Sequence, residues 1–142
     1  MKLEINRITT DSEQGVTIVQ GDVQAGFPSP AQGEYGDVID LNAELINHPE
    51  TTFCARVIGT SMKDAGINEG DLIIIDRSLQ AESGSIAVCF LDGDFTVKRV
   101  IIKSDGVYLA PANDRFPEIK VMQSQDFRIW GVVTHIIKKI TL

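Results

Sequence analysis

The chain has 142 residues, of which 43% are hydrophobic and 23% charged, and a formal net charge of −7 at pH 7. This length fits one domain that buries roughly two-thirds of its unfolded surface, with about the first 30 residues expected to lie outside the core. The negative charge argues against direct nucleic-acid binding, because that affinity comes mainly from clustered Lys and Arg.

Targeting and redox signals are weak in this sequence. No apolar run approaches the ~20 residues that span a bilayer, and the N-terminus lacks the basic stretch and apolar block of a signal peptide. We therefore expect no membrane association and a cytoplasmic location, which argues against a membrane-anchored signal peptidase. Cys54 and Cys89 lack the paired spacing of a metal or redox site. We expect both to be reduced core thiols, and we expect no metal and no cofactor.

The N-terminal quarter of the chain predicts little regular structure. Residues 1–25 hold two short β-like runs, Leu3 to Ile8 and Val16 to Val19, and predict an extended arm. They lack the two amphipathic helices of a helix-turn-helix domain. Residues 26–37 are rich in proline and glycine, which oppose regular structure, and predict a flexible linker.

Residues 38–142 predict a mainly β domain with one short helix. The helix spans Asp40 to Asn47, is capped by Asp40 or Asn42 and ends before His48-Pro49. Asp92-Gly93 predicts a hairpin turn between two strands. The apolar or alternating runs that predict strands are Phe53 to Ile58, Asp71 to Asp76, Ser85 to Leu91, Phe95 to Ile102, Val107 to Ala110 and Phe127 to Ile137.

Two pairs of like-charged residues are interpreted as having no catalytic or binding role. Asp71 and Asp76 bound one predicted strand, and we interpret them as its solvent-exposed ends rather than as a catalytic carboxylate pair. Lys138 and Lys139 are interpreted as part of a solvated face.

A serine and a lysine suggest peptidase chemistry. Ser61 follows Gly59 in a segment that favours a tight turn, and Lys98 lies in an apolar predicted strand. A serine hydroxyl needs a base, and an uncharged amine can serve when burial lowers the pKa of the lysine. Only His48 and His135 offer an alternative imidazole base. On spacing alone, a loop hydroxyl and a solvated amine remain the commoner explanation.

The strand that carries Lys98 does not reveal its buried face. Alternation places Lys98 with Thr96 and Val100 on one face and Val97 with Arg99 on the other. Both faces are largely apolar, so periodicity leaves the choice open. We favour an inward Lys98, because Arg99 is harder to neutralise.

Further motifs, all in one order, surround both candidate residues. From Ala25 to the C-terminus the chain resembles the UmuD branch of the LexA-type self-cleaving proteins. The motifs that carry this resemblance are Gly26-Phe27-Pro28-Ser29-Pro30, Ile39-Asp40-Leu41-Asn42, Leu45-Ile46, His48-Pro49, Gly59-Thr60-Ser61-Met62, Gly66-Ile67, Gly70-Asp71-Leu72, Asp92-Gly93, Phe95-Thr96-Val97-Lys98 and Gly131-Val132-Val133.

The resemblance implies a LexA/UmuD-type peptidase β-domain over residues 38–142. It also implies that Ser61 is the nucleophile, that Lys98 is the general base and that the Ala25–Gly26 bond is cut. In the turn that we expect around Ser61, backbone N–H groups of Thr60, Ser61 and Met62 could face the developing oxyanion.

The same resemblance implies partners. In this family, a RecA filament on single-stranded DNA stimulates self-cleavage after DNA damage, and the trimmed homodimer joins a UmuC-like Y-family polymerase for translesion synthesis. Two other functions stay open: a polymerase accessory or regulatory module that does not depend on cleavage, and a small LexA-like repressor.

Overall fold

The computed structural model describes residues 2–8, 15–19, 35–59, 62–112, 115 and 117–141. The chain divides into two compact units, one of Met1–Ile8 with Glu50–Leu142 and one of Thr9–Pro49. Among the described residues, no helix combines the length and the hydropathy that crossing a bilayer requires.

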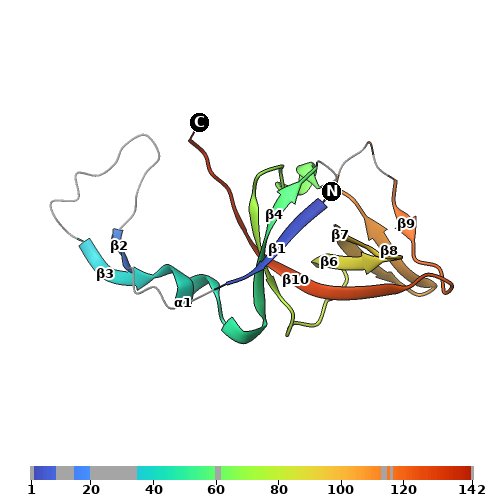
Figure 1. Ribbon diagram of the computed structural model, residues 1–142, viewed down its shortest axis with the longest axis horizontal. Helices are drawn as coiled ribbons and strands as arrows, with labels where there is room; N and C mark the ends of the chain where they lie inside the picture. Colours follow the sequence, from blue (N-terminus) through green and yellow to red (C-terminus); the bar gives the residue numbers. More distant parts are fainter. Residues whose placement is uncertain are drawn as a thin grey trace. The chain divides into compact units, whose positions relative to one another are not determined.

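The first unit is built on an 8-stranded antiparallel sheet in the order β1-β4-β5-β10-β6-β7-β8-β9 (Figure 1). Short 3₁₀ turns at Pro49–Thr51 and Lys63–Ala65 accompany it. The strands are β1 (Lys2–Arg7), β4 (Thr52–Ile58), β5 (Leu72–Asp76), β6 (Ile86–Leu91), β7 (Asp94–Lys103), β8 (Gly106–Ala110), β9 (Ile119–Lys120) and β10 (Phe127–Ile137).

The second unit pairs β2 (Gly15–Val19) with β3 (Tyr35–Asp40) and continues into α1 (Leu41–Leu45). The Asp40 carboxylate accepts hydrogen bonds from the N–H groups of Asn42 and Ala43, which caps the helix as predicted. The helix ends at Leu45, because Ile46 is already extended. The predicted fold class, mainly β with one short helix, is confirmed.

The hairpin signal is also confirmed. Leu91 pairs with Asp94 across a two-residue turn, in which Asp92 and Gly93 have φ of 47° and 94°. Positive φ at both central residues gives the twist that joins antiparallel strands, and Asp-Gly adopts it readily. The six predicted strands are present, whereas β3 and β9 were not predicted. β3 begins at Tyr35, inside the range assigned to the linker.

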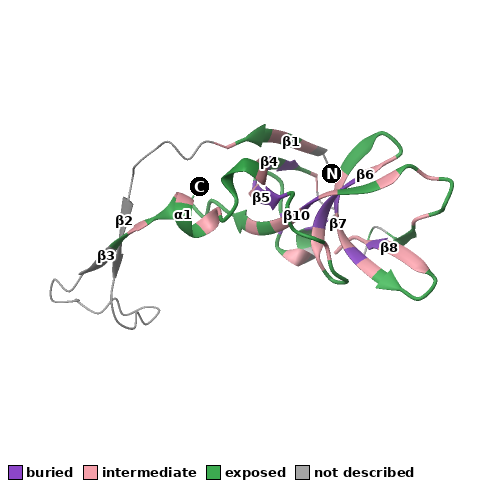
Figure 2. Cartoon of the chain, turned by 90° about the horizontal axis from the view of Figure 1, so that it is seen from below, coloured by how far each residue is buried: buried purple, intermediate pink, exposed green. Residues whose placement is uncertain are grey.

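Two apolar clusters fill the first unit, and they lie on opposite faces of its central strands. Neighbouring residues alternate between them, so β6 and β7 are buried on both faces, as the purple segments of Figure 2 indicate. The fully buried members are Ala55, Val57, Met62, Ile67, Ile73, Ile75, Val88 and Val97 in the first cluster, and Ala87, Cys89, Val100 and Leu109 in the second, of which Leu109 is 1% exposed.

Asp71 and Asp76 correct the sequence interpretation. They are only 6% and 4% exposed, not solvent-exposed strand ends. Asp76 Oδ1 accepts hydrogen bonds from the Thr51 hydroxyl and from the N–H and hydroxyl of Ser78. Lys138 is exposed, as interpreted, and forms an ion pair with Asp71. Buried carboxylates of this kind are tolerated because each is hydrogen-bonded.

The N-terminal strand also departs from expectation. β1 was expected outside the core, but Leu3 and Ile5 pack against the first apolar cluster. Cys89 is buried as predicted, whereas Cys54 is only half-buried; both are free thiols.

Candidate active site

The structure fixes the chain on both sides of residues 60 and 61, which lie outside the described residues. β4 ends at Ile58, and Gly59 follows with φ of 111°, a left-handed conformation that glycine adopts without strain. Met62 begins the next turn, where its carbonyl accepts hydrogen bonds from the N–H groups of Ala65 at 3.0 Å and Ile67 at 3.2 Å. The predicted turn around Ser61 lies outside the described residues, and the described chain resumes in the turn that begins at Met62.

The side chain of Met62 makes further contacts. Its side chain is fully buried in the first apolar cluster, and its Sδ accepts a hydrogen bond from the N–H of Ala112 at 3.4 Å. Ala112 comes shortly after β8, which pairs with β7. The turn at Met62 is thus linked to the segment after β8. Met62 packs in the first apolar cluster, whereas Lys98 lies on the β7 face of the second cluster.

Lys98 lies in the middle of β7, directly opposite Ala87 of β6. Alternation places it on the same face as Val100, toward the second apolar cluster. On the other face, Arg99 donates from Nη1 to the carbonyl of Gly84 at 2.8 Å. Lys98 and Arg99 are both half-buried, and a buried cluster lines each face of β7, so the inward orientation of Lys98 stays a prediction.

The surroundings of Lys98 alter its proton affinity. Burial lowers the pKa of Lys98, because a charged ammonium is poorly solvated there. Burial also raises the pKa of the neighbouring Cys89 thiol to about 12, although the charge of Lys98 opposes that shift. Cys89 therefore stays a neutral thiol at physiological pH, and burial outweighs its electrostatic effect, which raises the pKa of Lys98. The arrangement increases the fraction of Lys98 that is a neutral amine, the form that a general base requires.

The described residues contain only part of the predicted site. Lys98 and Met62 are described, whereas Ala25, Gly26, Thr60 and Ser61 lie outside the described residues. Of the two histidines, His135 lies on β10, where its Nδ1 is 2.9 Å from the Thr134 hydroxyl.

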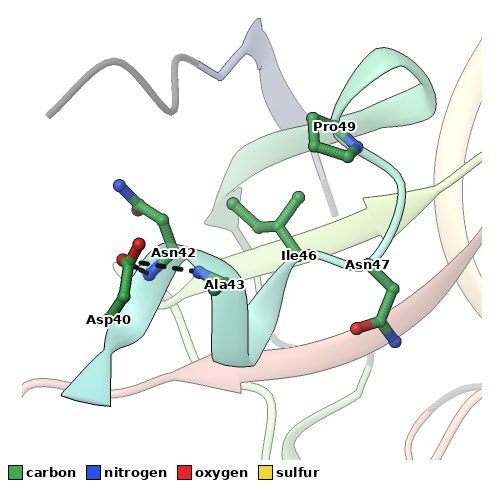
Figure 3. Close-up of a pocket in the computed structure, with 6 residues that line it drawn as sticks. All are labelled: Asp40, Asn42, Ala43, Ile46, Asn47 and Pro49. Carbon is green, nitrogen blue, oxygen red and sulfur yellow. Dashed lines mark hydrogen bonds between the residues drawn. The ribbon is translucent and has the colours of Figure 1, made fainter. Parts of the chain in front are cut away.

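A hollow of about 430 Å³ beside α1 has no catalytic character (Figure 3). Asp40 is the charged residue among the six that line it, and its carboxylate points at the helix N-terminus to form the cap. The lining residues are Asp40, Asn42, Ala43, Ile46, Asn47 and Pro49.

The sequence reasoning missed a cluster of arginine and aromatic side chains around a second hollow of about 270 Å³. The guanidinium of Arg77 lies 4.4 Å from the ring centre of Trp130, and that of Arg128 lies 4.5 Å from the ring centre of Phe90. The hairpin turn contained a signal for this cluster, because its register places Phe90 opposite Phe95. We call it the arginine–aromatic cluster: Arg77, Phe90, Phe95, Arg128, Ile129 and Trp130.

The sequence profile of the Peptidase S24-like family matches residues 17–134. The chain belongs to this family. It is 42% identical over 114 residues to Protein MucA of Salmonella typhimurium, an alignment that covers 80% of this chain and 77% of that protein. It is 40% identical over 116 residues to Protein ImpA of Escherichia coli, covering 82% and 79% of the two chains.

The chain is also similar to a LexA repressor, at lower identity. The LexA repressor of Anaeromyxobacter dehalogenans is 37% identical over 126 residues, which cover 87% of this chain and 55% of the repressor. The resemblance to the UmuD branch of LexA-type proteins is thereby confirmed, and the chain is a serine peptidase of the S24 type.

Proposed function

We propose that this S24 peptidase is a self-cleaving SOS mutagenesis protein, in which Ser61 and Lys98 cut the Ala25–Gly26 bond. The observation that carries the proposal is Lys98, a half-buried lysine whose pKa burial lowers, in the middle of a strand of an S24-family sheet. The S24 match and the relatives MucA and ImpA support the function as a whole.

The chemistry proceeds in two stages. Neutral Lys98 takes the proton of the Ser61 hydroxyl, and the oxygen attacks the carbonyl carbon of Ala25. Backbone N–H groups of Thr60, Ser61 and Met62 stabilise the oxyanion, at about 3 kcal/mol per donor. Lys98 then gives the proton to the departing amine of Gly26, which leaves an acyl-enzyme on Ser61.

Water completes the reaction by hydrolysing the acyl-enzyme, with Lys98 again as the base. The products are the arm, residues 1–25, and a trimmed chain that keeps the linker, residues 26–37, and the peptidase domain, residues 38–142. The arm carries charges of +2 (Lys2, Arg7) and −4 (Glu4, Asp11, Glu13, Asp22), so a chain of −7 becomes a product of −5. Attack within one chain or one dimer benefits from a high effective concentration of the bond.

The resemblance to the UmuD branch suggests the partners. A RecA filament on single-stranded DNA docks the arm and stimulates cleavage, in the cytoplasm where such filaments form. The trimmed protein acts as a homodimer with a UmuC-like Y-family polymerase. The exposed Phe95 and Ile129 of the arginine–aromatic cluster support dimerisation, because aromatic and aliphatic side chains are enriched in the buried cores of interfaces.

Two alternative functions make different predictions. A polymerase accessory module that does not need cleavage would keep its function in a Ser61→Ala variant. A small LexA-like repressor would bind an operator as the intact chain, which its charge of −7 disfavours.

The deciding experiment is intact mass spectrometry of the purified chain at pH 7 and at about pH 10, where a lysine base loses its proton more fully. We expect cleavage between Ala25 and Gly26 that accelerates in alkali and disappears in Ser61→Ala and Lys98→Ala. Lys103→Ala, at the exposed end of the same strand, is the matched control and should cleave normally. An uncut chain at both pH values, even with a RecA filament, would exclude self-cleavage.

A further inference from the structure

The N-terminal strand closes one edge of the main sheet. β1 runs antiparallel to β4, with Leu3 opposite Val57 and Ile5 opposite Ala55 (Figure 1). These two aliphatic side chains pack against the first apolar cluster, whose members Val57 and Ala55 are fully buried. β4 pairs with β5 on its other side, so without β1 it would become an edge strand with unpaired N–H and C=O groups.

β1 has a distinct side-chain pattern. Leu3 and Ile5 face the core, and between them the exposed Glu4 stands opposite the exposed Arg56 of β4. Opposite charges on directly paired residues favour that register, while the Arg56 guanidinium itself donates to the carbonyl of Gly70 at 3.0 Å. The edge of β4 thus selects an extended segment with an aliphatic, an acidic and a second aliphatic residue in succession.

The proposed cleavage would change how β1 is held; on this point the inference rests on the proposed function. β1 lies within residues 1–25, so a cut at Ala25–Gly26 breaks its covalent link to the sheet. The arm would then be held by β1 on β4 and by β2 on β3. The second hold is weak, because a two-stranded sheet is only marginally stable in water.

Loss of the covalent tether weakens the arm relative to any other segment that competes for the edge of β4. A tethered strand competes at an effective concentration of up to about millimolar, whereas a free fragment competes at its actual concentration. At micromolar protein, the cut therefore weakens the arm as a competitor on the order of 10³-fold.

We propose that the edge of β4 is a strand-receiving site, which residues 2–7 occupy in the uncut chain and a partner protein occupies after cleavage. The partner contributes an extended segment with the aliphatic–acidic–aliphatic pattern of Leu3, Glu4 and Ile5. Main-chain hydrogen bonds supply affinity, and the two aliphatic positions supply specificity, as in other cases of strand addition. The arm is then an internal plug, and cleavage admits the partner.

The test separates this site from the self-cleavage reaction. Residues 9–14, which join β1 to β2, are replaced by the recognition sequence of an added site-specific protease in a Ser61→Ala chain. After that protease cuts, the β1 fragment is held without a covalent link, by its pairing with β4 and its packing on the first apolar cluster. The cut protein is mixed with an excess of an isotope-labelled peptide of residues 1–8 and followed by native mass spectrometry.

We expect the fragment to remain bound after the cut and the labelled peptide to replace it one for one. A peptide with Leu3→Asp and Ile5→Asp should compete on the order of 10²-fold less well, whereas Asn6→Asp, at an exposed position, should compete within a few-fold. The uncut chain should take up on the order of 10²-fold less peptide.

Two results would overturn the proposal: a fragment that departs at once with no uptake of peptide, or equal uptake of the Leu3→Asp, Ile5→Asp peptide. Because the cut does not use Ser61, neither result depends on whether the chain cleaves itself.

Discussion

Lys98 shows how a strand buried on both faces can favour a neutral amine. Ala87 stands opposite it, Val100 shares its face, and Cys89 nearby stays neutral. Burial among these residues outweighs the electrostatic effect of Cys89, so the pKa of Lys98 is lowered. The feature that would make Lys98 a base also costs the folded protein free energy.

This cost predicts how stability changes with pH in a Lys98→Met variant. Because burial lowers the pKa of Lys98 below 10.5, the folded chain releases this proton at a lower pH than the unfolded chain. The penalty for the charge is therefore present at neutral pH and disappears as pH rises from the lowered pKa to about 10.4. Lys98→Met should thus be more stabilising at pH 7 than at about pH 10.5. Urea unfolding in a Ser61→Ala background measures the difference, and a difference independent of pH would contradict the prediction.

Asp71 illustrates the opposite case, a buried carboxylate that its partners keep charged. Burial raises its pKa, but the Lys138 ammonium and the N–H of Asn68, at 2.8 Å, outweigh that effect, and the pKa of Asp71 is lowered overall. Its contribution to stability is present above the unfolded pKa of about 3.9 and is lost as pH falls through the lowered value.

We therefore expect Asp71→Asn to cost about 1–3 kcal/mol of unfolding free energy at pH 7. The loss should shrink as the pH falls below about 3.9, where the parent loses the same contribution. Urea unfolding at both pH values checks this, with Glu69→Gln as an exposed neighbouring control that should stay within about 0.5 kcal/mol. An equal loss at neutral and acid pH would show that shape, not charge, matters at this position.

At the scale of elements, β10 organises the main sheet. It pairs with β5 on one side and β6 on the other, and its register shifts near Gly131 and near Thr134. A Cβ added at Gly131 would lie 2.6 Å from Cγ2 of Ile75. The glycine is required here by the close approach of β5, since contacts this short do not occur between real side chains.

Gly131→Ala should accordingly destabilise the fold by about 1–3 kcal/mol through overpacking. The neighbour responsible can be identified by a double-mutant cycle with Ile75→Ala, in which Gly131→Ala should cost at least about 0.5 kcal/mol less. Thermal and urea unfolding of the four proteins supply the data. Additive effects would place the strain elsewhere than at Ile75.

The same elements show what the sequence could predict. The Asp92-Gly93 turn and six strands were predictable, because turn chemistry and apolar runs are local signals. β9 has only two residues and β3 follows a glycine-rich stretch, so neither gives a local pattern. The buried face of β7 was not predictable, because Val97 and Val100 are buried on opposite faces.

Non-local contacts explain the other features that the sequence did not predict. The buried Asp71 pairs with Lys138, which lies 67 positions away, and local patterns do not encode that pairing. Within the site, the positive φ of Gly59 and the half-buried position of Lys98 are compatible with the sequence analysis. The roles of Ser61, Ala25 and Gly26 stay predictions, which the cleavage experiment tests.

At the scale of the whole molecule, net charge and exposed apolar surface have opposite effects on the association of two copies. Each copy carries −7, so two copies repel, and any face that joins them must gain more by burial than it loses by repulsion. The arginine–aromatic cluster suits this role, because Phe95 and Ile129 are 41% and 38% exposed beside Arg77 and Arg128. Added salt should strengthen such a dimer by screening the repulsion.

Phe95→Asp should therefore weaken the proposed homodimer by on the order of 30-fold or more, because an aromatic anchor in an interface typically contributes at least about 2 kcal/mol. Sedimentation equilibrium of the Ser61→Ala chain and its Phe95→Asp variant would measure the dissociation constants, with circular dichroism to confirm the fold. Ile119→Asp is the matched control, because Ile119 is similarly exposed, at 40%, but lies on β9, outside the cluster. Ile129→Asp should reproduce the effect of Phe95→Asp. If both cluster variants dimerise as tightly as the Ile119→Asp control, the copies meet through another face, and the cluster has to be explained by a different partner.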